Sequence, residues 1–505
     1  MDRIQQTSEH GPGTGAGLRL REIVWVAIAQ AGVPLASIAS VKLLTRLLVP
    51  SDYGAVAIVT SCVLAALAVA LVPMSGPGTI LFHEWTKIGR TREFLGTLLS
   101  FYAVPACLIA VGLVFLASVR QLSASPLVNA AILYGALLVF TEVIKAPAII
   151  LINMARLRRR YALLSLLDGW GKLLLVLLMI ILAGDTFQSV LVAYALNSAV
   201  VAFVGWYGLF NSNSGDESSA RLPLFSAALL SSMLKSGWPF YVIGVANWVI
   251  SVSDRALLGV LMSAHDVGIY SASCQVAAIF PMILYSFVGA LVFPVIYQRY
   301  SWSPPEAAVL IGQSLGFLVW LIVPLTLGAI LWKDVLLSLF VGRGYETGAP
   351  VILWVAPALA LNTLISITAM PFWLGGRSST YLVITAGAAA CNVLLNLLLI
   401  PQMGFLAAAV STFAAYLILF IASIVVGRRV INWKIAPTHL WGTGIGVAAA
   451  SAAFIMSGED ASLVRVGVFA VAYFSSSIAL LFLIDETSRV MVRSAFSRLT
   501  VWGRV

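Results

Sequence analysis

The feature that most constrains this chain is a series of fourteen apolar segments, each close to the roughly 20 residues that a helix needs to cross a bilayer. None of them shows the alternation typical of transmembrane strands, and an isolated strand would leave its backbone hydrogen bonds unmade in lipid. We therefore predict an all-α polytopic membrane protein. The predicted spans cover residues 23–45, 54–74, 95–118, 128–153, 162–183, 188–210, 236–254, 270–293, 308–331, 349–374, 380–400, 404–427, 438–457 and 463–484.

The distribution of positive charge predicts the orientation of these spans. With fourteen spans both termini lie on one side, and the tails and loops of that side carry 21 of the 30 lysines and arginines. The positive-inside rule then places both termini in the cytoplasm. The net charge of +10 is attributed to topology and to contact with anionic lipid rather than to nucleic acid.

The longest polar connection divides the spans into six before it and eight after it. We expect a disordered cytoplasmic tail at 1–20, an N-lobe of six spans at 21–210, a flexible cytoplasmic linker at 211–233, and a C-lobe of six spans at 234–430. Two further spans and a cytoplasmic tail occupy 431–505. The chain has no Walker A motif for ATP-driven pumping, and no external loop large enough for a domain.

Two sequence echoes relate the predicted lobes. An Asp-x-Gly motif follows the first span at Asp52 and Gly54, and another follows the seventh span at Asp266 and Gly268. The two motifs are 214 residues apart. A tight turn at Gly184 is matched by one near residue 404. Because the offset is six spans, the lobes would be parallel repeats about an axis normal to the membrane, with the substrate path between them. The alternative is chance similarity among apolar segments.

Three of these segments resemble a known family. They are "KLLTRLLVPSDYGAVAI" at 42–58, "SDRALLGVLMSAHDVGIYS" at 253–271 and "NLLLIPQMGFLAAAVSTFAAY" at 396–416. Their order and spacing are similar to those of the Wzx-type polysaccharide flippases of the multidrug/oligosaccharidyl-lipid/polysaccharide (MOP) exporter superfamily. The resemblance implies two six-helix lobes plus two C-terminal helices. It also implies translocation of an undecaprenyl-pyrophosphate-linked oligosaccharide from the cytoplasmic to the periplasmic leaflet of a bacterial inner membrane.

Four charged residues fall inside predicted spans. Glu142 and Lys145 are three residues apart on the fourth span, and Asp168 and Lys172 are four apart on the fifth, so each pair shares a helix face. An unpaired charge at a span centre costs on the order of 2.5–3.5 kcal/mol. With a rise of about 1.5 Å per residue, opposite charges on the two helices lie at matching depths. We predict the interhelical ion pairs Lys145–Asp168 and Glu142–Lys172.

These pairs have two interpretations. They are either a structural clasp that locks the helices together, or a border of the substrate cavity. In the second case they would exchange partners when pyrophosphate arrives or when a carboxylate takes up a proton or sodium ion. Reversing Glu142 and Lys172 together should restore what the single reversals lose.

Further cations lie near the predicted outer boundary. Lys42 and Arg46 share a face at the end of the first span, and Arg255 lies beside Asp254 at the end of the seventh. One interpretation is snorkelling to lipid headgroups. The other is contact with the substrate pyrophosphate, to which guanidinium groups offer bidentate hydrogen bonds. We predict anion contacts at Lys42, Arg46 and Arg255, with Lys145 and Lys172 as deeper contacts.

The sequence indicates transport rather than catalysis. It contains no predicted catalytic residue, no metal-ligand cluster and no cofactor motif, which leaves a proton or sodium ion as a possible coupling ion. Expected partners are the lipid-linked oligosaccharide, the phospholipid bilayer and a polysaccharide polymerase or co-polymerase, without nucleic acid. The alternatives are a cation-coupled exporter of amphipathic drugs and a membrane-embedded polymerase or ligase that acts on polyprenyl sugars.

Several aromatic residues inside spans also have two interpretations. Trp170, Trp206, Trp248, Tyr241 and Tyr285 could stack on sugars or could pack between helices. Tryptophan and tyrosine favour membrane interfaces and helix contacts without any ligand, so packing is favoured.

Overall fold

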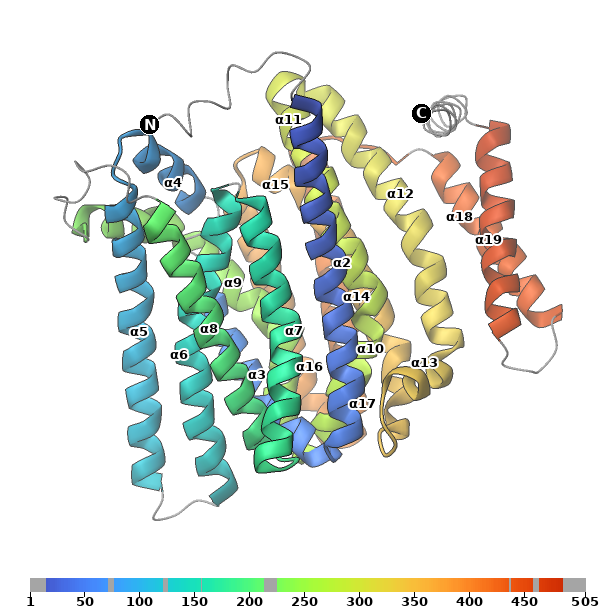
Figure 1. Ribbon diagram of the computed structural model, residues 1–505. Helices are drawn as coiled ribbons and strands as arrows, with labels where there is room; N and C mark the ends of the chain where they lie inside the picture. The colour runs from blue at the N-terminus through green and yellow to red at the C-terminus, as the bar shows by residue number, and fades with distance from the viewer. Residues whose placement is uncertain are drawn as a thin grey trace. The chain divides into compact units, whose positions relative to one another are not determined.

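A computed structural model of the chain describes residues 15–70, 77–120, 126–155, 157–212, 225–435, 437–456 and 463–484 (Figure 1). Every regular element within these residues is helical, which confirms the predicted all-α class. Thirteen helical segments in the described residues are long and apolar enough to cross a membrane. The fourteenth predicted span corresponds to a helix with a shorter apolar stretch, Arg465–Ile478.

Twenty helical elements are described within these residues. In chain order they are α2 (Gly15–Leu47), α3 (Pro50–Ala70), α4 (Pro77–Lys87), α5 (Thr91–Arg120), α6 (Pro126–Met154), α7 (Arg158–Ala183), α8 (Phe187–Ser212), α9 (Ala227–Leu261), α10 (Ala264–Phe287), the π-helix η3 (Val288–Val292), α11 (Phe293–Trp302), α12 (Pro304–Leu331), α13 (Lys333–Phe340), the 3-10 helix η4 (Glu346–Gly348), α14 (Ala349–Thr368), α15 (Met370–Leu374), α16 (Ser378–Met403), α17 (Phe405–Val430), α18 (Pro437–Met456) and α19 (Leu463–Ile484).

The chain forms two compact units. The first comprises the described residues within 1–275 together with 340–348 and 385–412. In it α6 packs against α5, α7 and α8, while α7 also packs against α2 and α3 packs against α9. These neighbours bring the charged faces of α6 and α7 together.

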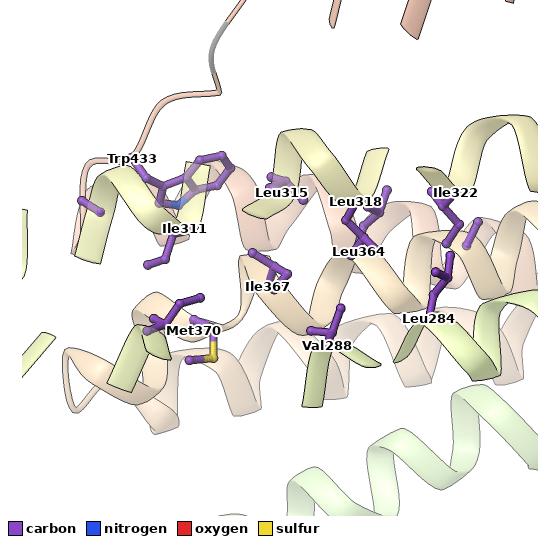
Figure 2. Packing of buried hydrophobic residues seen from close by; sticks show 13 residues of the cluster. Leu284, Val288, Ile311, Leu315, Leu318, Ile322, Leu364, Ile367, Met370 and Trp433 are labelled. Carbon is purple, nitrogen blue, oxygen red and sulfur yellow. The ribbon is translucent and has the colours of Figure 1, made fainter. Parts of the chain in front are cut away.

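The second unit comprises 276–339, 349–384 and the described residues within 413–505. Its core follows one stripe of α12, where Ile311, Leu315, Leu318 and Ile322 recur at helical spacing and are all buried (Figure 2). Leu284, Leu364, Ile367 and Trp433 come from other segments and belong to the same cluster. At the end of the chain α18 and α19 pack against each other.

The seventh and eighth spans differ from their predicted bounds of 236–254 and 270–293. The helix α9 continues to Leu261, and α10 begins at Ala264 and runs through Pro281 to Phe287. Membrane helices tolerate proline because neighbouring groups compensate for the lost hydrogen bond. The proline that does mark a boundary is Pro294, which lies in the first turn of α11 directly after the π-helix.

Parts of the predicted tails and linker lie outside the described residues, namely 1–14, 213–224 and 485–505. Within the described part, α2 begins at Gly15 and α9 begins at Ala227, with Ser226 as its N-cap. The side chain of Ser226 accepts a hydrogen bond from the backbone N–H of Leu229. Residues 227–233 of the predicted linker are therefore helical.

Candidate functional site

The four charged residues of α6 and α7 form a closed ring of ion pairs. Lys145 Nζ lies 2.8 Å from Asp168 Oδ1 and 2.7 Å from Glu142 Oε2. Lys172 Nζ lies 3.0 Å from Glu142 Oε1 and 3.6 Å from Asp168 Oδ1. Both predicted interhelical pairs are present. Each lysine also contacts the acid of its own helix, so positive and negative groups alternate around the ring.

The ring is unevenly buried. The Lys145 side chain is 4% exposed, whereas the side chains of Asp168 and Lys172 on α7 are 26% and 24% exposed. The α6 half is thus packed in protein, and the α7 half is the part that another molecule could reach. Burying each charge against two opposite charges offsets the cost of removing it from water.

The third helix of the site, α8, was not anticipated from the sequence. Ser198 Oγ donates a 2.7 Å hydrogen bond to Glu142 Oε1. Asn197 Nδ2 donates to the backbone carbonyl and to Oδ1 of Asp168, at 3.2 and 3.3 Å. Lys172 Nζ lies 5.3 Å from the centre of the Tyr194 ring. The signal available in the sequence was the adjacent polar pair at 197–198 in the middle of an apolar span.

A glycine lets α8 approach the ring this closely. A Cβ atom added to Gly171 would lie only 2.5 Å from Asn197 Oδ1. Any larger residue at this position would push Asn197 away from Asp168. Trp206 fixes α8 against α6 further along, because its indole N–H donates to the carbonyl of Ile144 at 2.9 Å.

Two other tryptophans that were candidates for sugar stacking make similar bonds. Trp170 donates to the carbonyl of Gly32 at 3.1 Å, and Trp248 donates to the carbonyl of Ser61 at 2.9 Å. Each indole N–H therefore joins two helices. This geometry supports the packing interpretation for these residues.

Asp254 and Arg255 lie elsewhere in the first unit. Because α9 extends to Leu261, they are inside the span and not at its end, where the sequence had placed them. Asp254 is buried and accepts hydrogen bonds from the hydroxyl of Tyr270 and from the backbone N–H of Arg255, the latter at 2.8 Å. Arg255 interacts electrostatically with Asp254 and Cys274.

Lys42 and Arg46 lie in the last two turns of α2. Lys42 is partly buried and Arg46 is exposed. Within the part of the chain that the structure describes, neither forms an ion pair, and neither they nor Arg255 form one with the ring. The structure thus brings together Glu142, Lys145, Asp168 and Lys172, and leaves the other predicted anion contacts outside that group.

The described residues contain no group of three or more His, Cys, Asp or Glu side chains that could hold a metal ion. Within the ring, Glu142 and Asp168 already have lysine and amide or hydroxyl partners. The two lysines and two acids form an electroneutral cluster. If a carboxylate bound another cation, a lysine could bind an anion.

The two sequence echoes have direct structural counterparts. The first turns of α3 and α10, which carry the two Asp-x-Gly motifs, cross with Gly54 facing Gly268. At the second echo, Gly184 and Gly404 both adopt positive φ, +90° and +66°, in the tight turns that follow α7 and α16. Equivalent positions of the proposed repeats thus have equivalent backbone roles.

The comparison with known families decides the family of the chain. The model of a family described as "Polysaccharide biosynthesis protein" matches residues 43–350, which is more than half of the chain. The chain belongs to this polysaccharide biosynthesis protein family. The matched range includes the whole charge ring and both Asp-x-Gly motifs, so the predicted family resemblance is confirmed.

A curated protein is similar to part of this chain. It is the probable low-salt glycan biosynthesis flippase Agl15 of Haloferax volcanii, 23% identical over 223 residues. The aligned region is 43% of this chain and 45% of the relative, so it spans less than half of that protein's length.

Solved structures show the fold of this polysaccharide biosynthesis protein. A lipid II flippase MurJ in an inward closed conformation matches with a TM-score of 0.70 and 11% identity, over 91% of this chain and 99% of that one. A multidrug resistance MATE family transporter of the MOP superfamily, in an inward-facing conformation, matches with a TM-score of 0.60 and 15% identity, over 81% and 98%. The predicted MOP-like fold is confirmed.

Proposed function

We propose that this chain is a flippase that moves an undecaprenyl-pyrophosphate-linked oligosaccharide from the cytoplasmic to the periplasmic leaflet of a bacterial inner membrane. The glycan would serve exopolysaccharide or O-antigen synthesis. Membership of the polysaccharide biosynthesis family, the partial similarity to a probable glycan flippase and the MOP-like fold all support this proposal.

The observation that carries the proposal is the ring of two lysines and two acids inside the membrane. A phosphate-bearing head group can cross hydrocarbon only where positive groups and hydrogen-bond donors replace water. Lys172 is one quarter exposed and shares its two carboxylates with Lys145. It can turn toward an incoming pyrophosphate while Lys145 stays in contact with both acids.

The mechanism that fits this arrangement is alternating access. The lobes, 21–210 and 234–430, would rock as parallel repeats, so that the ring faces first one side and then the other. Lys42, Arg46 and Arg255 would provide further anion contacts, and Asp254 would pair with Arg255. Both termini would be cytoplasmic, following the excess of lysine and arginine on their side.

We also propose that uptake and release of a coupling ion drive transport. A proton or sodium ion taken up by Glu142 or Asp168 would weaken its hold on the lysines and expose them to the substrate. Release of that ion would restore the closed ring and displace the pyrophosphate. A polymerase and co-polymerase in the membrane would then receive the translocated glycan.

Two other functions make different predictions. A drug exporter of the MATE type would have a site dominated by acids and aromatic residues, whereas this ring contains equal numbers of lysines and acids. A polymerase or ligase would form new glycosidic bonds. Neither alternative requires two lysines within the spans.

The decisive experiment uses the full-length protein in proteoliposomes loaded with a fluorescent lipid-linked oligosaccharide. Wild-type protein should expose the labelled glycan to an impermeant quencher on the opposite leaflet without changing its mass. Lys172→Gln should slow this movement strongly, while Lys333→Gln, which removes a more exposed pair with Asp334, should not.

Three outcomes would contradict the proposal. They are the absence of movement with correctly folded wild-type protein, new glycosidic bonds detected by mass spectrometry, and transport of a cationic dye in place of the glycan. A deletion strain should accumulate lipid-linked repeat units in the cytoplasmic leaflet, and unchanged levels would argue against the pathway.

A further inference from the structure

A short segment docks on the end of α2. The backbone N–H of Gly342 donates to Thr45 Oγ1 at 3.0 Å, and the hydroxyl of Tyr345 donates to the carbonyl of Leu48 at 3.1 Å. Tyr345 is completely buried and its ring packs edge-on against Tyr53, with centroids 5.9 Å apart. These contacts join residues 340–348 to the first unit of the chain.

The contact is close enough to fix the position of the neighbouring arginine. A Cβ atom added to Gly342 would lie 2.0 Å from the carbonyl oxygen of Thr45 and 3.0 Å from Arg46 Cα. The backbone at 342 is therefore pressed against Arg46. Arg343 follows in sequence and is exposed, as Arg46 is. Two arginines that are almost 300 residues apart in the chain thus lie on segments whose backbones touch.

Lys42 adds a third positive charge. It lies one helical turn from Arg46 on the same face of α2. The acids near this place, Glu346 and Asp52, form no ion pair with the three cations among the described residues. Glu346 accepts a hydrogen bond from the backbone N–H of Gly344 at 2.8 Å, and Asp52 lies in the first turn of α3.

Three other described cations on the proposed periplasmic side have partners. Lys333 pairs with Asp334 at 2.6 Å, Arg255 lies beside Asp254, and Arg465 donates to the carbonyl of Phe454 at 2.8 Å. Lys42, Arg46 and Arg343 have no carboxylate partner among the residues that the structure describes. Like charges within a screening length of about 8 Å repel one another, and a bound anion relieves that repulsion.

We propose that Lys42, Arg46 and Arg343 form a phosphate-binding site at the proposed periplasmic end of α2, separate from the charge ring. This inference rests on the proposed function and adds the place where the pyrophosphate of the translocated lipid is held on leaving the protein. Guanidinium groups bind phosphate oxygens in pairs, and two arginines with a lysine can hold both phosphates of a pyrophosphate. A phospholipid headgroup offers the same chemistry to the site.

The test measures binding of farnesyl pyrophosphate, a short soluble probe, to the purified full-length protein in detergent. The double variant Arg46→Gln/Arg343→Gln should bind the probe about tenfold more weakly than wild type, the change expected when one bidentate contact is lost. Arg377→Gln is the matched control, because Arg377 is also an exposed loop arginine without an ion pair in the described residues. Equal affinity in the double variant and in wild type would overturn the proposal.

A second variant tests the docking of the segment without changing charge. Gly342→Ala inserts a methyl group where the carbonyl of Thr45 lies, so Arg343 must move away from Arg46. It should weaken probe binding while the variant keeps wild-type elution on size exclusion. Gly344→Ala is its control, because no atom lies within 4 Å of the added Cβ, although its φ of +93° adds some strain. Weaker binding in Gly344→Ala alone would contradict the role of the contact.

Two further arms distinguish the source of the phosphate and separate this inference from the proposed function. Nanodiscs with phosphatidylglycerol or with phosphatidylcholine alone show whether a lipid headgroup competes with the probe. Competition by phosphatidylglycerol supports the site with a phospholipid as occupant, and its absence supports the substrate. If the double variant moves and binds lipid-linked glycan as wild type does, this inference fails alone. If wild type binds the probe at these residues but moves no glycan, the proposed function fails.

Discussion

Gly54 and Gly268 lie in reciprocal backbone contact. A Cβ atom added to Gly54 would be 1.7 Å from the carbonyl oxygen of Ala264, and one added to Gly268 would be 1.9 Å from the carbonyl oxygen of Pro50. The two motifs that the sequence related by an offset of 214 residues therefore cross each other at the ends of two spans. Because neither glycine has a side chain, the two helix ends can pack backbone against backbone.

Substitution of either glycine should open this crossing. Gly54→Ala and Gly268→Ala place a methyl group on a backbone carbonyl, and we expect each to lower the free energy of unfolding by about 1–3 kcal/mol, as overpacking does. The measurement is thermal unfolding of the purified protein in detergent. Gly112→Ala on α5 is the control, because no atom lies near its added Cβ. Equal melting temperatures for all three variants would refute the contact.

Removing one lysine from the ring should be severe. Lys145→Gln leaves Glu142 and Asp168 with only Lys172 as a cationic partner, and Lys145 is the most deeply buried member. Breaking a buried ion pair from one side costs about 3–5 kcal/mol. We expect a large loss of folded protein in the membrane, measured by fluorescence-detected size exclusion. Lys333→Gln removes a more exposed pair and should keep wild-type levels.

The ring also changes the expected result of charge reversal. The sequence alone suggested that Glu142→Lys with Lys172→Glu would restore function. In the ring this double reversal puts two lysines together on α6 and two acids together on α7, because each residue also contacts its neighbour on the same helix. Only the fourfold reversal of Glu142, Lys145, Asp168 and Lys172 keeps the alternation of charge. It should yield more folded protein than the double reversal. A higher yield from the double reversal would rule out the closed ring.

Loss of the hydroxyl of Ser198 should be moderate. Ser198→Ala removes the 2.7 Å hydrogen bond to Glu142, and a bond to a charged group contributes about 1.5–3 kcal/mol. We expect a lower melting temperature and slower glycan movement. Ser37→Ala is a suitable comparison, because the hydroxyl of Ser37 donates only to the carbonyl of Val33 in its own helix. Indistinguishable effects of the two substitutions would show that the bond to Glu142 is unimportant.

Gly184 tests the turn that follows α7. Its φ of +90° is unfavourable for residues with a Cβ atom, although no atom would lie within 4 Å of an added one. Gly184→Val should therefore destabilise the protein by about 1–2 kcal/mol through backbone strain alone. Gly387→Val, in the middle of α16 with equally open surroundings, should cost less. Thermal unfolding of the two variants side by side decides the point.

The sequence by itself determined the membrane class, nearly every span and two of the four ion pairs. These follow from local quantities, namely the length of apolar runs, the side of a helix on which a charge lies and its depth along the axis. A charge inside lipid needs an opposite charge as a partner, so the matching depths of Lys145 and Asp168 were enough to predict their contact. The Asp-x-Gly motifs likewise marked Gly54 and Gly268 as matching positions of the proposed repeats.

Only the tertiary structure decided which residues from distant parts of the chain complete each site. Asn197 and Ser198 reach the ring because Gly171 lets α8 approach α7, and Arg343 lies beside the end of α2 because Gly342 fits against it. The position of Asp254 inside its span depended on α9 continuing to Leu261. Such contacts arise from packing between helices far apart in sequence, and the periodicity of a single helix carries no information about which neighbour it will have.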